Sequence, residues 1–102
     1  MVRMVLIYKT PTDTAAFDKH YFGTHVPLAK KLPGLRKFEV SQGPIDTLSG
    51  PAGAYLVATM YFDDMTAIEE ASTSAEAQAL VIELQSSKTD LPYALLFDSR
   101  EV

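Results

Sequence analysis

The chain contains two histidines, His20 and His25, and these are the side chains best suited to proton transfer. An unperturbed histidine titrates near pH ~6.5, so at cellular pH it can both accept and donate a proton. Tyr21 lies one helical turn before His25, where its hydroxyl could orient the imidazole or stabilise a developing oxyanion. His25 and Tyr21 are therefore the candidate catalytic pair.

The position of His25 also fits a purely structural role. A lone histidine is a weak indicator of catalysis, and a half-buried imidazole that hydrogen-bonds a broken helix would show the same spacing. Spacing alone favours this structural role, so catalysis at His25 is a hypothesis that needs support from other features of the chain.

Other common reaction centres find little support in the sequence. The chain has no cysteine, which excludes disulfides, thiolate metal sites and cysteine nucleophiles. Histidines five positions apart fall on opposite edges of an α-helical stripe, whereas helical metal ligands favour spacings of three or four, so we predict no metal site. The glycines form neither a Walker pattern nor a dinucleotide-binding pattern.

Both histidines fall within a predicted amphipathic helix, residues 13–32. Its inward stripe consists of four residues at helical spacing: Phe17, Tyr21, Thr24 and Leu28. Gly23 loosens this helix, and Pro27 lacks an amide donor and crowds the carbonyl of Gly23. We therefore expect a kink or a restart near His25, which would turn its ring toward a cleft between helix and sheet.

Four strands and a second helical region complete the predicted fold. The strands are expected at residues 2–9, 35–43, 54–62 and 91–102, and residues 43–53 form a turn-rich connection. The second helical region follows Asp63–Asp64 and restarts near Thr73, which has capping-box spacing to Glu76. Its apolar stripe is expected to consist of Ala77, Leu80, Val81 and Leu84. The order βαββαβ predicts one α+β, ferredoxin-like domain over residues 1–102, with two helices on one face of a four-stranded antiparallel sheet.

The second face of this sheet is also expected to be apolar. In residues 54–62 neither alternating set of side chains is charged, and small aliphatic groups suit the helix side, so we assign Leu56, Met60 and Phe62 there. Tyr55 and Tyr61 are then assigned to the opposite face. Soluble monomers rarely expose such a surface, so we predict a homodimer packed sheet to sheet. The alternative is a monomer whose loop covers that face.

The composition excludes several partners. The formal net charge is −4, whereas proteins that bind nucleic acid or anionic membranes usually carry a basic excess. No apolar run approaches the roughly 18 residues of a membrane span, and residues 1–9 are a poor match to a signal peptide. We therefore expect a cytoplasmic protein with no nucleic-acid partner and no membrane partner.

Residues 17–35, FDKHYFGTHVPLAKKLPGL, closely resemble the signature of the EthD family, a branch of the dimeric α/β-barrel superfamily. That signature has a phenylalanine, a tyrosine four residues later, a histidine four after that, then x-P-L and a terminal L-P-G-L. The matching positions are Phe17, Tyr21, His25, Pro27, Leu28 and Leu32-Pro33-Gly34-Leu35. A weaker similarity continues through residues 61–80, where members often have Ser-Pro-Glu-Gly and this chain has Ser74-Ala75-Glu76-Ala77.

The resemblance implies a ferredoxin-like protomer that dimerises through its sheets into an α/β barrel. Superfamily relatives include isomerases, polyketide cyclases and monooxygenases that act without a cofactor on small, often aromatic or lactone-like molecules, and others degrade haem. In several relatives a cavity between helices and sheet holds a histidine and a tyrosine, which correspond here to His25 and Tyr21. Because one fold hosts many chemistries, family membership does not assign the reaction.

Three hypotheses follow. The first is an enzyme without cofactor that applies acid/base chemistry to a small, mostly apolar organic molecule in catabolism or tailoring. His25 would be its general acid/base, and its pocket would be lined by Phe17, Tyr21, Met60 and Phe62. The alternative is a non-catalytic dimer that binds a small ligand or assists a partner enzyme, which the sparse catalytic inventory favours. Haem handling would require an open cleft with an axial histidine and is the least favoured.

Overall fold

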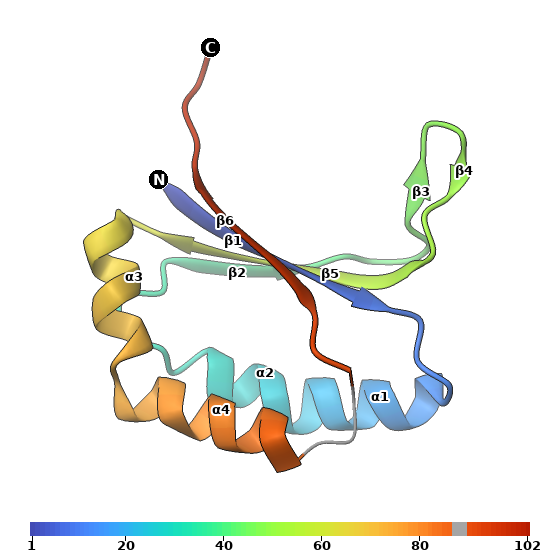
Figure 1. Cartoon of the computed structure of the whole chain (residues 1–102), viewed down its shortest axis with the longest axis horizontal. Helices are drawn as coiled ribbons and strands as arrows, with labels where there is room; N and C mark the ends of the chain where they lie inside the picture. Colours follow the sequence, from blue (N-terminus) through green and yellow to red (C-terminus); the bar gives the residue numbers. More distant parts are fainter. Residues whose placement is uncertain (87–89) are drawn as a thin grey trace.

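The structure is a computed structural model that describes residues 1–86 and 90–102. Its main sheet is antiparallel and four-stranded, in the order β2-β5-β1-β6. These strands are β1 (Val2–Lys9), β2 (Lys37–Val40), β5 (Ala54–Phe62) and β6 (Tyr93–Asp98). All helical segments lie on one face of this sheet (Figure 1): α1 (Thr14–His20), the π-helix η1 (Tyr21–His25), α2 (Val26–Ala29), α3 (Met65–Ser72) and α4 (Ala75–Ser86). The predicted α+β, ferredoxin-like order is confirmed.

The central strands β1 and β5 pair along their whole length and set the inner face of the sheet. Val2 lies opposite Phe62, Met4 opposite Met60, and Leu6 opposite Ala58. On β5 the predicted helix-side residues are buried, with exposed fractions of 4% for Leu56, 4% for Met60 and 1% for Phe62. The predicted inward parity of this strand is therefore confirmed.

The prediction that Tyr55 lies on the outer face is wrong. Lys9 pairs with Ala54 and Tyr8 with Leu56, so the register shifts by one residue and Tyr55 has no partner on β1. An unpaired residue of this kind is a β-bulge, which bends the strand and redirects side chains. The hydroxyl of Tyr55 donates to the carboxylate of Asp18 on α1, at 2.9 Å. Tyr55 therefore ties the start of β5 to the helix layer.

The helix layer and the sheet enclose two separate clusters of buried side chains. The first lies toward α3 and consists of Val2, Ala29, Met60, Phe62, Ile68 and Ala71. The second is largely aromatic and consists of Tyr8, Phe17, Tyr21, Leu56 and Ala58. This division matters for the site, because it separates Met60 and Phe62 from the aromatic side chains of α1 and η1.

Local capping explains where the helices begin. Asp13 caps α1, because its carboxylate accepts from the amide of Ala16 at 3.0 Å. Asp64 caps α3 in the same way through Ala67, at 2.8 Å. The α4 cap differs from the prediction: the hydroxyl of Ser74, and not Thr73, accepts from the amide of Ala77 at 3.1 Å.

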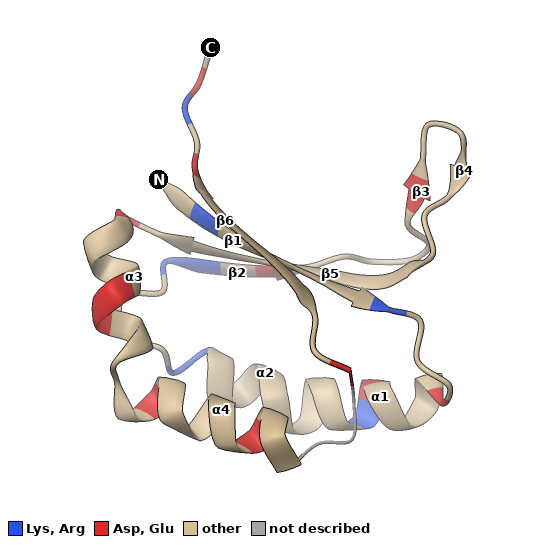
Figure 2. Ribbon diagram, viewed as in Figure 1, with Lys and Arg blue, Asp and Glu red and all other residues tan. Residues whose placement is uncertain are grey.

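Two further boundaries differ from the predictions. The connection over residues 43–53 contains a small hairpin of β3 (Asp46–Thr47) and β4 (Gly50–Pro51), which projects away from the helix layer (Figure 1). The second predicted strand is shorter than expected and covers only β2. Lys and Arg lie near both ends of β1, β2 carries both basic and acidic residues, and Asp or Glu residues lie on α3 and α4 (Figure 2).

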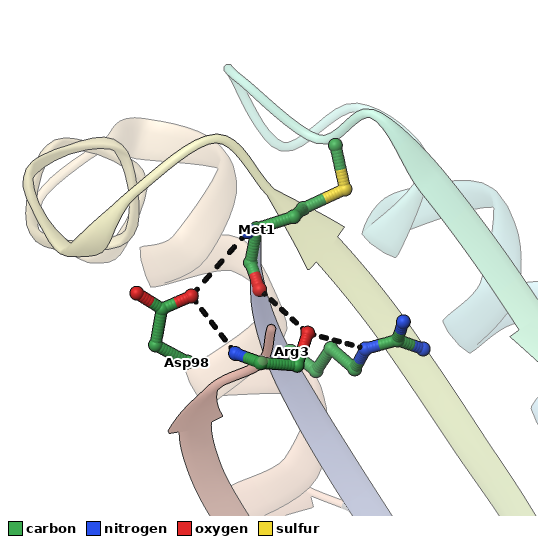
Figure 3. Close-up of polar contacts among 4 residues, drawn as sticks. Met1, Arg3 and Asp98 are labelled. Carbon is green, nitrogen blue, oxygen red and sulfur yellow. Dashed lines mark hydrogen bonds and ion pairs between the residues drawn. The ribbon is translucent and has the colours of Figure 1, made fainter. Parts of the chain in front are cut away.

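Polar contacts fasten the edge strand β6 to the start of β1 (Figure 3). The amino group of Met1 donates to the carboxylate of Asp98 at 3.3 Å. The hydroxyl of Ser99 donates to the carbonyl of Met1 at 3.1 Å and accepts from Nε of Arg3 at 3.0 Å. These contacts hold the register between β1 and β6 at this end of the sheet.

Within the described residues, every helix is too short or too polar to cross a lipid bilayer.

Candidate functional site

The predicted first helix is divided into three segments by a π-helical turn. In η1 the amide of Val26 donates to the carbonyl of Tyr21, five residues earlier, and α2 then begins with Pro27 in its first turn. Proline fits the start of a helix because its missing amide needs no partner there. The predicted restart near His25 is confirmed, and it takes the form of a π-turn, a feature frequent at functional sites.

The π-turn brings both histidines to one carboxylate, Glu83 on α4. Nδ1 of His25 lies 2.9 Å from Oε2 of Glu83, and Nε2 of His20 contacts Oε1 of the same side chain. The prediction that the two rings lie on opposite edges of the helix is therefore wrong. It assumed α-helical geometry, whereas an i→i+5 turn places residues five apart nearly one turn apart.

Glu83 is a buried carboxylate with an exposed fraction of 8%. Burial alone would raise the pKa of Glu83, but hydrogen bonds from His25 and His20 outweigh it and lower the pKa below its ordinary value. Because an ionised carboxylate only accepts hydrogen bonds, Nδ1 of His25 and Nε2 of His20 carry the protons. Nε2 of His25 and Nδ1 of His20 are then the basic nitrogens.

Aromatic rings surround His25 on its other side. The ring of Tyr21 stacks on the imidazole with centroids 5.1 Å apart, and Phe17 stacks on Tyr21 at 5.5 Å. Tyr8 on β1 meets Phe17 and Tyr21 edge-on, at 5.6 Å and 5.3 Å. Tyr21 thus orients His25 through the face of its ring. His25 itself is buried, with an exposed fraction of 5%.

Two tyrosine hydroxyls in this cluster are suited to donate hydrogen bonds. The Tyr21 hydroxyl is buried beside the Tyr8 side chain and makes no hydrogen bond of ordinary geometry within the described residues. Burial, with a contribution from the neighbouring Tyr8, raises the pKa of Tyr21 well above its ordinary value. Burial likewise raises the pKa of Tyr8 to about 12. Both hydroxyls therefore stay protonated at cellular pH.

An open cavity of about 560 Å³ adjoins the aromatic cluster. It lies between the end of β1, the start of α1, Ser86 at the end of α4 and Asp90. Its lining includes Tyr8, Lys9, Asp13, Phe17, His20 and Asp90. His20 and Phe17 therefore line this cavity, whereas His25 and Tyr21 lie behind them in the aromatic cluster.

The structure thus brings together three of the five predicted site residues. Phe17, Tyr21 and His25 form one stacked series, and Phe17 also lines the cavity. Met60 and Phe62 pack in the other cluster, against Ile68 and Ala71 of α3, and do not line the cavity.

Sequence reasoning missed Glu83 and Tyr8. Glu83 was not identified because the predicted apolar stripe of its helix included Val81, which is 52% exposed. The inward positions include Leu80 and Leu84, which are partly buried, with Glu83 between them. A single acidic residue at an inward helix position is a signal that sequence reasoning could have used, because buried carboxylates are rare without partners.

Within the described residues, His20, His25 and Glu83 hydrogen-bond one another directly, and no three His, Asp or Glu side chains are arranged so that they could hold a metal ion.

The sheet order, the one-sided helix layer and the site define a ferredoxin-like α+β protein. The EthD domain model matches residues 9–84, so this chain belongs to the EthD family. An uncharacterized 11.0 kDa protein from the thcB–thcC intergenic region of Rhodococcus erythropolis is 39% identical over 79 residues, covering 76% of this chain and 75% of that protein.

Two solved structures place this fold among its relatives. The crystal structure of an EthD-family protein from Bacillus halodurans has a TM-score of 0.86 and 32% identity, with 98% of this chain and 99% of that one covered. SnoaB from Streptomyces nogalater, a cofactor-independent oxygenase, has a TM-score of 0.66 and 17% identity, with 99% and 94% covered. The second likeness concerns the fold alone.

Proposed function

We propose that this EthD-family protein is a cofactor-independent enzyme that moves protons on a small, mostly apolar organic molecule. The reaction would be of the isomerase, cyclase or monooxygenase type. The observation that carries the proposal is a buried histidine, His25, held by the buried carboxylate Glu83 at 2.9 Å and stacked on Tyr21. A fold shared with a cofactor-independent oxygenase is consistent with this class of chemistry.

The roles of the individual groups follow from their geometry. Glu83 holds the Nδ1 proton of His25 and stabilises the imidazolium that forms when Nε2 accepts a proton. The buried hydroxyl of Tyr21 would donate to the oxyanion of a ligand that extends past Phe17 and His20 into the aromatic cluster. Phe17 and Tyr8 supply an apolar wall for the ligand body.

The test is exchange of acidic C–H protons in deuterated water, followed by ¹H NMR on a panel of enolisable aromatic ketones and lactones. We expect His25→Ala to slow the exchange about 10²-fold or more, since a positioned acid/base contributes that much. Tyr21→Phe should slow it less and leave the protein folded. The prediction that Thr24 lies on the inward stripe is wrong, because the π-turn leaves it exposed. Thr24→Ala is therefore the matched control and should leave the rate unchanged. An unchanged rate in His25→Ala would remove His25 from the mechanism.

A second candidate function is non-catalytic binding of a small ligand or assistance to a partner enzyme. The observation that favours it is the burial of His25, whose exposed fraction is 5%, behind the residues that line the cavity. In this case His25 would serve only as a structural partner of Glu83. Ligand affinity would then be the same in His25→Ala as in the wild type, and no exchange would accompany binding.

The proposal includes a homodimer packed through the outer face of the sheet. On the outer face, Val5, Ile7 and Val57 are apolar, and every residue of β6 is exposed in the single chain. Toward β2 the same face is polar: Arg3 donates to the hydroxyl of Tyr61, which donates to the carboxylate of Glu39. A second copy would shield the apolar part of this surface.

A further inference from the structure

His20 differs from His25 in that it reaches the cavity. The side chain of His20 is 42% exposed, whereas that of His25 is 7% exposed. His20 is also the only histidine that lines the described cavity, together with Phe17 and Tyr8. A ligand in this cavity would therefore meet His20 before it could meet His25.

The two histidines are joined through one carboxylate. The two oxygens of Glu83 are divided between them, Oε1 to His20 and Oε2 to His25. A positive charge on one imidazole therefore interacts with the same carboxylate that hydrogen-bonds the other imidazole. A carboxylate that orients an imidazole and stabilises its protonated form is a recurring device of acid/base sites.

We propose that His20 is a second catalytic residue, which exchanges protons with an enolisable carbonyl compound in the cavity, and that Glu83 is the positioning residue that couples it to His25. This inference rests on the proposed function and extends it. Nδ1 of His20 is the nitrogen turned away from Glu83, and it is the atom that meets the ligand.

The step is balanced without any further reagent. A proton leaves the carbon next to the ligand carbonyl and joins Nδ1 of His20. The electron pair of the broken C–H bond forms a C=C bond, and the π pair of the C=O bond moves to oxygen, which gives the enolate. The imidazolium of His20 is neutralised by Glu83. Return of the proton to a different atom of the ligand completes an isomerisation and restores His20.

The surroundings of His20 suit this ligand class. Phe17 and Tyr8 form an apolar wall, and Lys9 is a cation of the same cavity that can attract the enolate oxygen. Among the described residues, the titratable groups that line this cavity with His20 are Tyr8 and Lys9 of β1, Asp13 before α1 and Asp90 before β6, and Glu83 of α4 contacts His20 from behind. Among these, Glu83 contacts the ring directly.

The experiment uses 2-tetralone, an apolar enolisable ketone, and 2-naphthol, which has the shape of its enol. Hydrogen–deuterium exchange of 2-tetralone is followed by NMR, and binding of 2-naphthol by ¹⁵N shifts of labelled histidines. We expect His20→Asn to slow exchange at least 10²-fold and to weaken 2-naphthol binding about tenfold. Thr24→Ala is the matched control and should change neither quantity.

Glu83→Gln tests the coupling, because the amide keeps the shape of the side chain and removes its charge. We expect a rate about tenfold lower, with the acid limb of the pH–rate profile moved, a change that loss of packing alone would not produce. Circular dichroism and the amide NMR spectrum show whether each variant is folded.

The outcomes separate this inference from the proposed function. Loss of exchange in His25→Ala with an unchanged rate in His20→Asn would overturn the role of His20 and leave the proposed function standing. Unchanged exchange in both variants would overturn both. A wild-type protein that neither exchanges 2-tetralone nor shifts the His20 signal with 2-naphthol would also overturn the role of His20 with this ligand class.

Discussion

At the scale of single residues, the centre of the site is Glu83 and not either histidine. The sequence indicated His25 and Tyr21 because histidine and tyrosine are recognisable acid/base types at a helical spacing. Glu83 was not predictable in the same way, because its partners lie 58 and 63 positions earlier in the chain. Only the packing of α4 against α2, in the same continuous helix as α1 and η1, brings the three side chains together.

The buried carboxylate should make the protein sensitive to acid. Because the folded state lowers the pKa of Glu83 below 4.5, its stabilising effect is present above that value and is lost as the pH falls through the folded pKa. Near neutral pH, Glu83→Gln should lower the free energy of unfolding by about 2 kcal/mol, as expected for hydrogen bonds to a charged group. The difference between the two proteins should shrink as the pH falls below 4.5 and through the lowered pKa of Glu83 in the folded state.

Urea denaturation of the wild type and Glu83→Gln across this pH range measures that difference directly. Other carboxylates that titrate in acid, such as Asp63 beside Arg36, are present in both proteins and cancel. A difference that stays constant or grows on acidification would show that Glu83 is not held as an anion in the folded protein.

At the scale of elements, the sequence was sufficient for the order of strands and helices but not for the inside of the first helix. Alternation in residues 54–62 and the 3.6-residue repeat near Phe17 are direct consequences of strand and helix geometry. The π-turn has no comparable repeat. Gly23 and Pro27 indicated a break, yet they did not indicate that the break would turn His20 and His25 toward the same side chain.

Two glycines near this helix should respond oppositely to the same substitution. A methyl group at Gly23 would meet no atom within 4 Å, and its backbone has no positive φ, so Gly23→Ala should stabilise the protein by about 0.5–1 kcal/mol. Gly34, after α2, has φ 78°, where an L side chain is strained, so Gly34→Ala should destabilise by about 1–2 kcal/mol. Thermal denaturation of both variants measures these effects. Melting temperatures that shift in the same direction in the two variants would contradict the prediction.

At the scale of the whole molecule, the exposed outer face of the sheet calls for a partner. Exposed fractions are 67% for Tyr93, 39% for Leu95 and 43% for Phe97, and β6 is an edge strand that pairs with β1 on one side only within the described residues. Soluble proteins usually cover such a surface and such an edge. The outer face of β5 was predictable from its alternation, whereas the inward turn of Tyr55 was not, because a single bulge reverses the parity.

We expect the protein to sediment at twice the 11.2 kDa of one chain. Val57 lies on the outer face of β5, opposite Ile7, so Val57→Lys should weaken the dimer at least tenfold. Val81→Lys makes the same change at an exposed position of α4 and should leave the dimer intact. Sedimentation velocity compares the three proteins, and a monomeric wild type would exclude the predicted homodimer.

The π-turn also has a consequence for comparing genes of this family. A wide turn across five residues and a regular turn across four present their end residues on the same side of a helix. A related gene that lacks one codon between those for His20 and His25 would therefore keep the same arrangement in an ordinary α-helix. An alignment gap at this position would mark a change in winding and not the loss of the paired imidazoles.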